Sequence, residues 1–452
     1  MGEQRRRLLI IGLDCAEPSL VFDRLKDRVP NLTRLCGQGV SGPLRSTDPP
    51  ITMPAWISMF TGKDPGELGI YGFRNRGDFS YGALSLVTSR SVEAPRVWDR
   101  LTEAGLTSYV LGVPGTYPTW PIKGRMVSSF LAPGNDSDYV YPPELKAEVE
   151  QLAGGYIIDV EGFRTEDKRW LLEQLHLMTR KRFEVARAWA AEPDWDLFAM
   201  VEMGPDRLHH GFWRFHDEHH RLFEPGNEFQ QAIPDYYAMI DEQIGTLLEA
   251  AGPDVGVLVV SDHGAQAMEG GFRINEWLIE QGDLVLLEEP ETPVRLTADM
   301  VDWEVTRAWG EGGYYARVFL NIEGRERMGT IPIDRADEFR ADLAGRLEQT
   351  ADEEGKPLGT RVLFPEKTYK EINGIPPDLI AYFGDLRWRS IGEVGTGVIH
   401  TRGNDTGPDD ANHAKRGIFI ERFPDVEGGG RVEERRLLDV AGRVLGYFGL
   451  DT

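Results

Sequence analysis

Short apolar runs alternate with longer amphipathic segments along most of the chain, and this alternation constrains the fold more than any other feature. Near-continuous apolar runs are typical of parallel strands that are buried on both faces of a sheet. The segments between them show the period of helices that could cover those faces. The sequence therefore predicts an α/β fold with a mainly parallel central sheet and helices on both faces.

The expected elements can be placed on the sequence. Strands are predicted in RLLIIGLD, TSYVLGVPG, DLFAMVEMG, VGVLVVSDHG, PDLIAYF and RGIFI. Helices are predicted over residues 20–37, 94–104, 143–152, 168–191, 229–251, 334–349 and 432–447. Residues 286–333 are rich in Gly and Glu and alternate over short segments, which predicts a small, β-rich inserted cap. The core would then consist of residues 1–285 and 334–452.

The charge balance limits the partners of the chain. It has 74 acidic and 50 basic residues, so its formal net charge is −24. Binding to a nucleic acid polymer needs a basic face, which makes such a partner unexpected. A small anionic substrate is still compatible, because a bound metal ion can reverse the local field.

Two further features bear on the cellular location. Cys15 and Cys36 are the two cysteines of the chain, which argues against a disulfide framework and favours a reducing compartment. The apolar run near the start is interrupted by Asp14, and no run is long enough to cross a bilayer. We therefore expect a cytoplasmic protein without a membrane partner, while the oligomeric state stays open.

Acidic residues follow several of the predicted strands. In parallel sheets, ligands bind beyond the carboxyl ends of the strands. The first strand ends at Asp14, DLFAMVEMG runs toward Asp206, and VGVLVV is followed by Asp262 and His263. One such acid would be an ordinary strand end, but three of them predict a common site.

Histidines supply further candidate ligands. Asp206 and His210 are four residues apart and would share one face of a helix. Carboxylate and imidazole together suit Zn²⁺, and Mn²⁺ would be tolerated. The alternative is a surface pair, because the tract HHGFWRFHDEHH holds five of the nine histidines. His413 comes just before the strand RGIFI, and His400 competes with it.

Thr52 is the candidate nucleophile. It lies in the Pro-flanked stretch DPPITMPAW, which leads into a helix predicted to begin near Pro54. A hydroxyl at a helix start lies beside free backbone N–H groups that favour an anion. The alternative is an ordinary N-cap threonine. Ser58 and Thr61 are rival hydroxyls inside the helix pattern.

Five motifs in order extend the argument: IIGLDCAEP, ITMPAWISMFTGKDPGELGIYGF, VEMGPDRLHHGFW, SDHGAQ and NHAKRGIFI. Together they resemble the alkaline phosphatase superfamily, most closely its type I phosphodiesterase/nucleotide pyrophosphatase branch, from residue 7 to about residue 420. The resemblance implies an alkaline phosphatase-like fold and two divalent metal ions, with Zn²⁺ expected and Mn²⁺ as the alternative. Carried over by position, it implies one site of Asp14, Thr52, Asp262 and His263, and another of Asp206, His210 and His413.

The resemblance also implies a function. It predicts a metal-dependent phosphoric ester hydrolase of the phosphodiesterase/nucleotide pyrophosphatase type, acting on a small phosphoester or nucleotide-like substrate through a phosphothreonine at Thr52. The alternatives are a phosphomonoesterase, phosphonate hydrolase or phosphomutase on the same core, and a non-catalytic metal-binding protein. The complete ligand set argues against the last. Monoester enzymes usually need an extra cation, which the sequence does not reveal.

The chain departs from the family pattern after the nucleophile. The family commonly has an Asn three residues after it, where this chain has Ala55, followed by Trp56. Backbone N–H groups, Lys63 or Arg74 could replace the missing contact with the phosphate. Trp56 could stack on a nucleobase or pack in the wall of the pocket.

Overall fold

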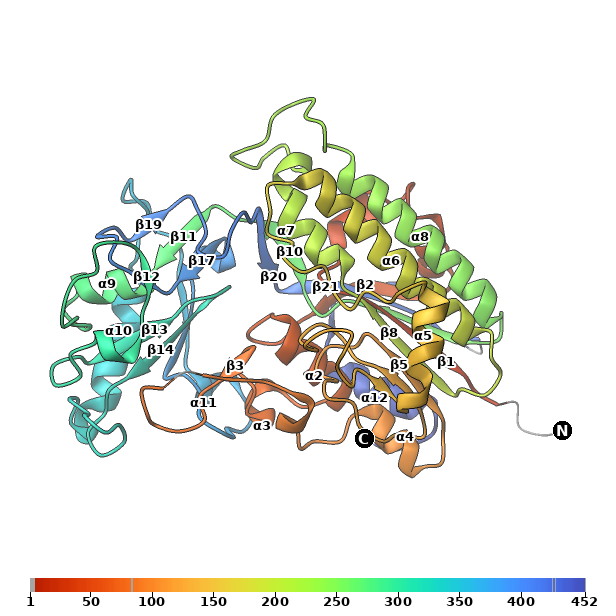
Figure 1. Cartoon of the computed structure of the whole chain (residues 1–452), viewed down its shortest axis with the longest axis horizontal. Helices are drawn as coiled ribbons and strands as arrows, with labels where there is room; N and C mark the ends of the chain where they lie inside the picture. The colour runs from red at the N-terminus through yellow and green to blue at the C-terminus, as the bar shows by residue number, and fades with distance from the viewer. Residues whose placement is uncertain (1–4, 83, 425, 427, 452) are drawn as a thin grey trace. The chain divides into compact units, whose positions relative to one another are not determined.

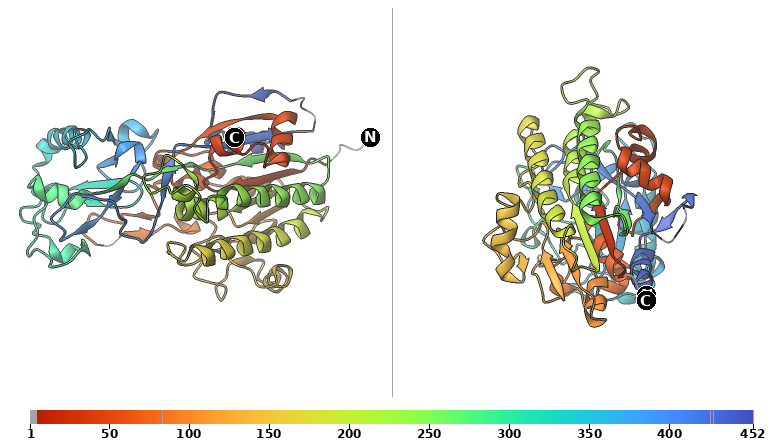
Figure 2. Two further views of the ribbon diagram at one scale, coloured as in Figure 1. Left: turned by 90° about the horizontal axis from the view of Figure 1, so that it is seen from above. Right: turned by 90° about the vertical axis from the view of Figure 1, so that its right-hand side faces the viewer.

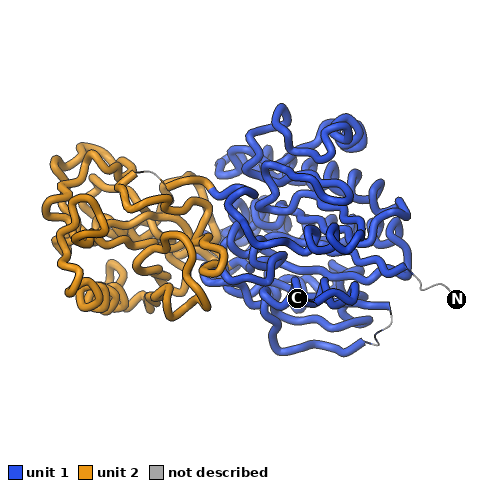
Figure 3. Tube along the Cα trace, turned by 90° about the horizontal axis from the view of Figure 1, so that it is seen from below, with its two compact units in different colours: residues 1–64, 87–265, 414–452 blue, residues 65–86, 266–413 orange. Residues whose placement is uncertain are grey.

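The computed structural model describes residues 5–82, 84–424, 426 and 428–451, and the chain divides into two compact units. Unit 1 consists of residues 1–64, 87–265 and 414–452 (Figure 3). Unit 2 consists of residues 65–86 and 266–413.

Unit 1 is built on a ten-stranded sheet. Its order is β22-β2-β21-β9-β1-β8-β5-β6-β7, with β23 also paired to β2. The bounds are β1 Leu8–Leu13, β2 Val40–Arg45, β5 Ser108–Leu111, β6 Gly124–Val127, β7 Val140–Tyr141, β8 Leu197–Glu202, β9 Gly256–Val260, β21 Arg416–Arg422, β22 Gly430–Arg431 and β23 Arg435–Arg436. The five neighbours β9, β1, β8, β5 and β6 are all parallel, and antiparallel strands flank them. The predicted mainly parallel sheet is confirmed.

The central strands of this sheet are buried throughout, because helices cover both of its faces. In Figure 1, α6, α7 and α8 lie on one face and α2, α4 and α12 on the other, and Figure 2 shows the same layers from two more sides. The helix bounds are α1 Pro30–Gln38, α2 Thr52–Thr61, α4 Val97–Glu103, α5 Lys146–Ala153, α6 Lys168–Ala190, α7 Gly204–His216, α8 Ala232–Ala251 and α12 Asp439–Tyr447.

Two of the predicted helices are wrong in extent. Residues 20–37 do not form one helix: Leu20–Arg24 is a single π-helical turn, and α1 begins at Pro30. Proline fits the first turn of a helix but interrupts one that would continue through it. The helix predicted over residues 432–447 is shortened to α12, because Arg435–Arg436 pairs with β2 as strand β23.

Unit 2 has its own sheets and core. The order of its largest sheet is β13-β14-β16-β15, and a second has the order β17-β11-β19. Their bounds are β11 Gly270–Arg273, β13 Ala308–Glu311, β14 Ala316–Leu320, β15 Arg361–Leu363, β16 Leu379–Tyr382, β17 Trp388–Ile391 and β19 His400–Thr401. Short ladders join β3 Arg74–Asn75 to β4 Ser85–Leu86 and β12 Val294–Arg295 to β18 Glu393–Val394. The helices are α3 Pro65–Leu68, α9 Ile274–Glu280, α10 Ala336–Glu348 and α11 Pro365–Thr368.

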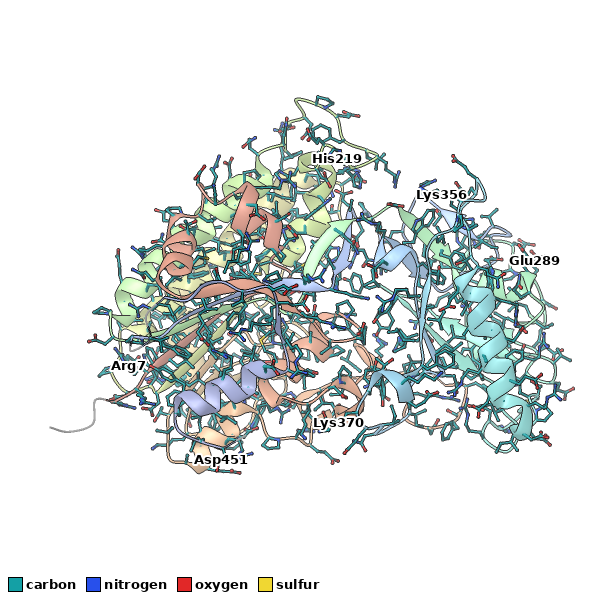
Figure 4. The ribbon with its side chains drawn as sticks, turned by 180° about the vertical axis from the view of Figure 1, so that it is seen from behind. Arg7, His219, Glu289, Lys356, Lys370 and Asp451 are labelled. Carbon is teal, nitrogen blue, oxygen red and sulfur yellow. The ribbon has the colours of Figure 1, made fainter. Side chains whose placement is uncertain are left out.

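The expected cap, residues 286–333, lies inside unit 2, whose bounds are wider. The strand predicted in PDLIAYF does form, as β16, but it belongs to the unit 2 sheet, because it pairs antiparallel with β14 and β15. Buried residues of β11, α9, α10, β14 and β16 share one hydrophobic core. Charged side chains such as Glu289, Lys356 and Lys370 point outward from this unit (Figure 4).

The chain crosses between the units four times, after Asp64, Leu86, Ala265 and His413. The last two crossings fall within the paired strands β10 Gly264–Ala267 and β20 Ala411–Ala414. In the described part of the chain, no helix has the length and apolar character that crossing a membrane would require.

Gly12 in β1 is a position where the packing of unit 1 can be tested. A Cβ atom there would lie 2.5 Å from Trp56 Cη2 and 2.7 Å from Val201 Cγ2. We expect Gly12→Ala to lower the free energy of unfolding by about 1–3 kcal/mol through overpacking. Gly37→Ala in α1 is the control, because nothing lies within 4 Å of its Cβ, and alanine there should stabilise by roughly 0.4–1 kcal/mol. Equal urea midpoints for the two variants would contradict this packing.

Candidate metal centre

Three carboxylates follow three neighbouring strands of unit 1. Strands β9, β1 and β8 are adjacent and parallel, so their carboxyl ends lie at the same edge of the sheet. Asp14 follows β1, Asp262 follows β9, and Asp206 lies in the first turn of α7, just after β8. All three side chains are buried. The convergence predicted from the strand ends is therefore present in the structure.

The first group of candidate ligands is Asp14, Asp262 and His263, whose ligand atoms all lie within 4.8 Å of one another. His263 Nε2 is 3.1 Å from Asp262 Oδ2 and 3.8 Å from Asp14 Oδ1. Among the described residues, neither of these two buried oxygens has a hydrogen-bond partner. Burying such oxygens without a partner is costly, whereas a divalent cation would satisfy both.

The orientation of His263 suits a ligand. Its Nδ1 lies 3.2 Å from the carbonyl oxygen of Gly264. A carbonyl oxygen can only accept a hydrogen bond, so Nδ1 carries the proton. Nε2 is then the nitrogen that faces the carboxylates, as in histidine ligands whose other nitrogen is held by the protein.

Thr52 is the first residue of α2 and is 3% exposed. Its Oγ1 lies 3.4 Å from His263 Nε2. The helix starts two residues earlier than predicted, and its N-cap is Ile51, with no side-chain capping bond. The N-cap alternative for Thr52 therefore does not hold. Thr61, a rival hydroxyl, donates to the carbonyl oxygen of Ile57 at the other end of the helix.

Of the second predicted ligand set, Asp206 and His210 lie in unit 1, and His413 is the last residue of unit 2. Asp206 and His210 stand on successive turns of α7, and Asp206 Oδ1 is 3.4 Å from His210 Nε2. The ring of His413 stacks on Tyr314 with their centroids 4.0 Å apart. The choice of His413 rather than His400 for this set stays a prediction.

His400 is engaged elsewhere in unit 2. Its Nε2 lies 2.8 Å from the carbonyl oxygen of Ala351, and its ring packs against Phe272 and Trp388. The ring of His400 thus has partners within unit 2.

The two carboxyl groups of the first site are electrostatically strained. Burial raises the pKa of Asp14 well above its ordinary value, and the charge of Asp206 raises it further. Burial also raises the pKa of Asp262, with a further contribution from Asp14. A bound cation would oppose both effects by favouring the charged carboxylates.

Trp56 contacts the first ligand group through its indole, and the sequence did not predict this contact. It is fully buried, and its indole Nε1 donates to Asp14 Oδ2 at 2.6 Å. The backbone N–H of Cys15, a residue in the left-handed region (φ 63°), donates to Asp262 Oδ1 at 3.2 Å. Each carboxylate thus keeps one oxygen, Asp14 Oδ1 or Asp262 Oδ2, directed toward His263. Trp56 thus donates to a candidate ligand, and its ring is fully buried.

We expect Trp56→Phe to weaken the binding of a metal ion by the first ligand group. The substitution keeps an aromatic ring but removes the donor to Asp14, and losses of such supporting bonds typically cost about 10–100-fold in metal affinity. Competitive titration with a chelator of known affinity measures the effect. Unchanged affinity in a folded variant would show that the bond to Asp14 is dispensable.

We also expect the stability gained from metal to grow with pH. The pKa values of Asp14 and Asp262 are raised in the folded state. The stability that these protonated groups contribute to the metal-free protein is therefore fully present below about pH 4, their ordinary range. It is lost as the pH rises through the raised values. Metal binding needs the deprotonated carboxylates. The difference in melting temperature between Zn²⁺-loaded and metal-free protein should widen from about pH 5 to pH 8. A constant difference would contradict the assignment.

Comparisons with known proteins agree with this geometry. The profile of the type I phosphodiesterase/nucleotide pyrophosphatase family matches residues 8–409. No curated protein matches the chain significantly in sequence. The structure of human ectonucleotide pyrophosphatase/phosphodiesterase 5 is similar, with a TM-score of 0.58 at 13% identity over 99% of this chain and 96% of that one.

The murine counterpart of that protein, an inactive threonine-to-alanine variant in complex with AMP, has a TM-score of 0.57 at 13% identity. It is covered over 95% of its length, and this chain over 98%. These similarities confirm the alkaline phosphatase-like fold. With the family profile spanning most of its length, the chain belongs to the type I phosphodiesterase/nucleotide pyrophosphatase family and is a hydrolase of that type.

Proposed function

We propose that the chain hydrolyses small phosphodiesters, nucleotide-like ones among them, with Thr52 as the nucleophile. The observation that carries the proposal is the position of Thr52 Oγ1, at the start of α2 and 3.4 Å from His263 in a buried acidic cluster. A threonine hydroxyl is a weak nucleophile unless a cation or base activates it. The neighbouring ligand group offers a place for that cation.

Each of the two candidate ligand groups would bind one metal ion. Asp14, Asp262 and His263, with Thr52, would hold one ion, and Asp206, His210 and His413 the other. Divalent ions bound there would lower the pKa of the threonine hydroxyl and stabilise charge on the phosphoryl and leaving oxygens. The mixture of imidazole and carboxylate ligands favours Zn²⁺, with Mn²⁺ as the alternative.

The residues of the chain then act in two steps. Thr52 Oγ1, after losing its proton, forms a bond to phosphorus while the bond to the leaving alcohol breaks, which gives a phosphothreonine. Water hydrolyses this ester, releases the phosphomonoester and restores the hydroxyl. The backbone N–H groups of Thr52 and Met53, the first two residues of α2, are suited to hold the phosphoryl oxygens. Pro54 has no N–H, and the N–H of Ala55 donates to the carbonyl oxygen of Ile51.

In this proposal these N–H groups take the place of the Asn that the family commonly uses, because Ala55 has no side-chain donor. Lys63 is not a substitute. It follows the C-cap of α2, which places it about 16 Å from Thr52 along the helix axis at about 1.5 Å per residue.

The charge of the site favours diesters over monoesters. Asp14, Asp206, Asp262 and an ionised Thr52 carry four negative charges, which two divalent ions would balance. A diester adds one further negative charge and a monoester dianion two. The cation beside Asp206 is Arg207, which is already paired with Asp159. The AMP complex of the murine neighbour supports a nucleotide-like substrate.

We also propose a cytoplasmic location. The proposal rests on the two cysteines, Cys15 and Cys36, which are both free thiols.

Thr52→Ala should abolish catalysis while the ligand set stays intact. We expect hydrolysis of bis(p-nitrophenyl) phosphate to fall by about 10⁴-fold or more, the scale seen when an enzyme loses its nucleophile. Elemental analysis should still find two ions in each chain. Thr52→Ser should keep part of the activity because it keeps a hydroxyl.

Thr61→Ala is the matched control on the same helix, and its turnover should equal that of the wild type. Full activity of Thr52→Ala would refute the nucleophile. Faster cleavage of p-nitrophenyl phosphate than of the diester by the wild type would keep the site and assign the protein to the monoesterases. No activity on either ester after Zn²⁺ or Mn²⁺ is added would leave a non-catalytic metal-binding protein.

A further inference from the structure

Arg207, the residue after Asp206, bridges two carboxylates inside unit 1. Its Nη1 donates to Asp206 Oδ2 at 2.5 Å. Its Nε and Nη2 donate to the two oxygens of Asp159 at 3.1 and 2.7 Å. This bidentate bond fixes the plane of the guanidinium group. The direction of Nη1, and with it the position of Asp206 Oδ2, is fixed as a consequence.

Aromatic rings enclose the same guanidinium group. Its carbon lies 4.5 Å from the ring centre of Phe163 and 5.3 Å from that of Phe130. Phe163 also packs near His210, with ring centres 6.0 Å apart. The Arg207 side chain is 7% exposed. The bond from Arg207 to Asp206 is therefore a buried part of the site, unlike an exposed ion pair that solvent would weaken.

The two oxygens of Asp206 thus have different surroundings. Oδ2 accepts from Arg207, and Oδ1 is the oxygen that faces His210 Nε2, 3.4 Å away. The same division occurs at Asp14, where Trp56 binds Oδ2 and Oδ1 faces His263. The difference is that Asp14 is held by a neutral indole and Asp206 by a cation that is itself held by Asp159.

We infer that Arg207, held by Asp159, is a positioning residue that presents Asp206 Oδ1 to the ion shared with His210. Without the fork of Arg207, Asp206 could rotate and Asp159 would keep a charge without its partner. The affinity for this second ion therefore depends on Arg207. The inference rests on the metal sites of the proposed function, but not on which phosphoester is hydrolysed.

Titration of the metal-free full-length protein with Co²⁺ tests this inference, because the visible absorbance of Co²⁺ reports its coordination. In Arg207→Gln we expect about 10–100-fold weaker binding of one ion and an altered absorbance for it, with the other ion unchanged. Arg207→Lys should be as weak, because lysine keeps the charge but cannot bind both carboxylates as a fork. Restoration of the affinity by lysine would overturn the geometric role.

Asp159→Asn tests the bond between Asp159 and Arg207. Asp159 is partly exposed, so this variant is expected to fold. Asp159 has a side-chain exposure of 19% and lines a cavity of about 500 Å³. Asp159→Asn should weaken the binding of the same ion as Arg207→Gln, and the double variant should bind that ion no more weakly than Arg207→Gln alone. Additive losses would mean that the two residues act independently, which contradicts the inference.

Arg214→Gln is the matched control. Arg214 stands on the same helix, donates to Glu166 at 3.1 Å and lies over Phe215, so its loss should leave both ions in place. Wild-type affinity in Arg207→Gln and Asp159→Asn would overturn the inference, as would a raised KM with unchanged affinity, which would assign Arg207 to the substrate. If Arg207→Gln does not fold, the Co²⁺ affinity of Asp159→Asn alone tests the inference. Weakened binding together with no esterase activity in the wild type would uphold this inference and refute the proposed function.

Discussion

Mutual repulsion among three buried carboxylates is the constraint on which the rest of the site depends. Asp14, Asp206 and Asp262 come together because β9, β1 and β8 are adjacent parallel strands with their carboxyl ends at one edge. Charged groups buried together without a cation are unfavourable. The structure restricts each carboxylate by a donor from the protein: Trp56, the Cys15 backbone and Arg207. The fold thus holds the remaining carboxylate oxygens in fixed positions, where a bound cation would be stabilised the most.

Much of this arrangement could be predicted from the sequence, because its signals are local. The apolar runs predicted β1, β8 and β9, and the acids that follow them predicted where the site lies. The spacing of Asp206 and His210 predicted a shared helix face, and both do stand on α7. The choice of His413 over His400 came from its place before a strand and stays a prediction.

The rest depends on contacts between residues far apart in the chain. Residues 65–86 fold with residues 266–413 through pairings such as that of Arg76 with Ile375, which no local pattern reveals. The strand after residue 432 pairs with β2, and this tertiary pairing overrides a helical pattern. The sequence offered Trp56 as a stacking surface or a pocket wall and indicated no role for Arg207. The roles proposed for them follow from the bond of Trp56 to Asp14 and from the bonds of Arg207 to Asp206 and Asp159. The spacing of Trp56 four residues after Thr52 was the one local signal.

The absence of a side chain at Gly12 has a consequence for how the site tolerates motion. It leaves room for Trp56 to lie against β1 and reach Asp14. One helix, α2, therefore carries both the candidate nucleophile and the support of a candidate ligand, a single turn apart on the same face. A small shift of α2 would move Thr52 and the indole together. The spacing between the Thr52 hydroxyl and the indole that binds Asp14 is thereby set within one helix, and the loops that lead to α2 can vary without changing it.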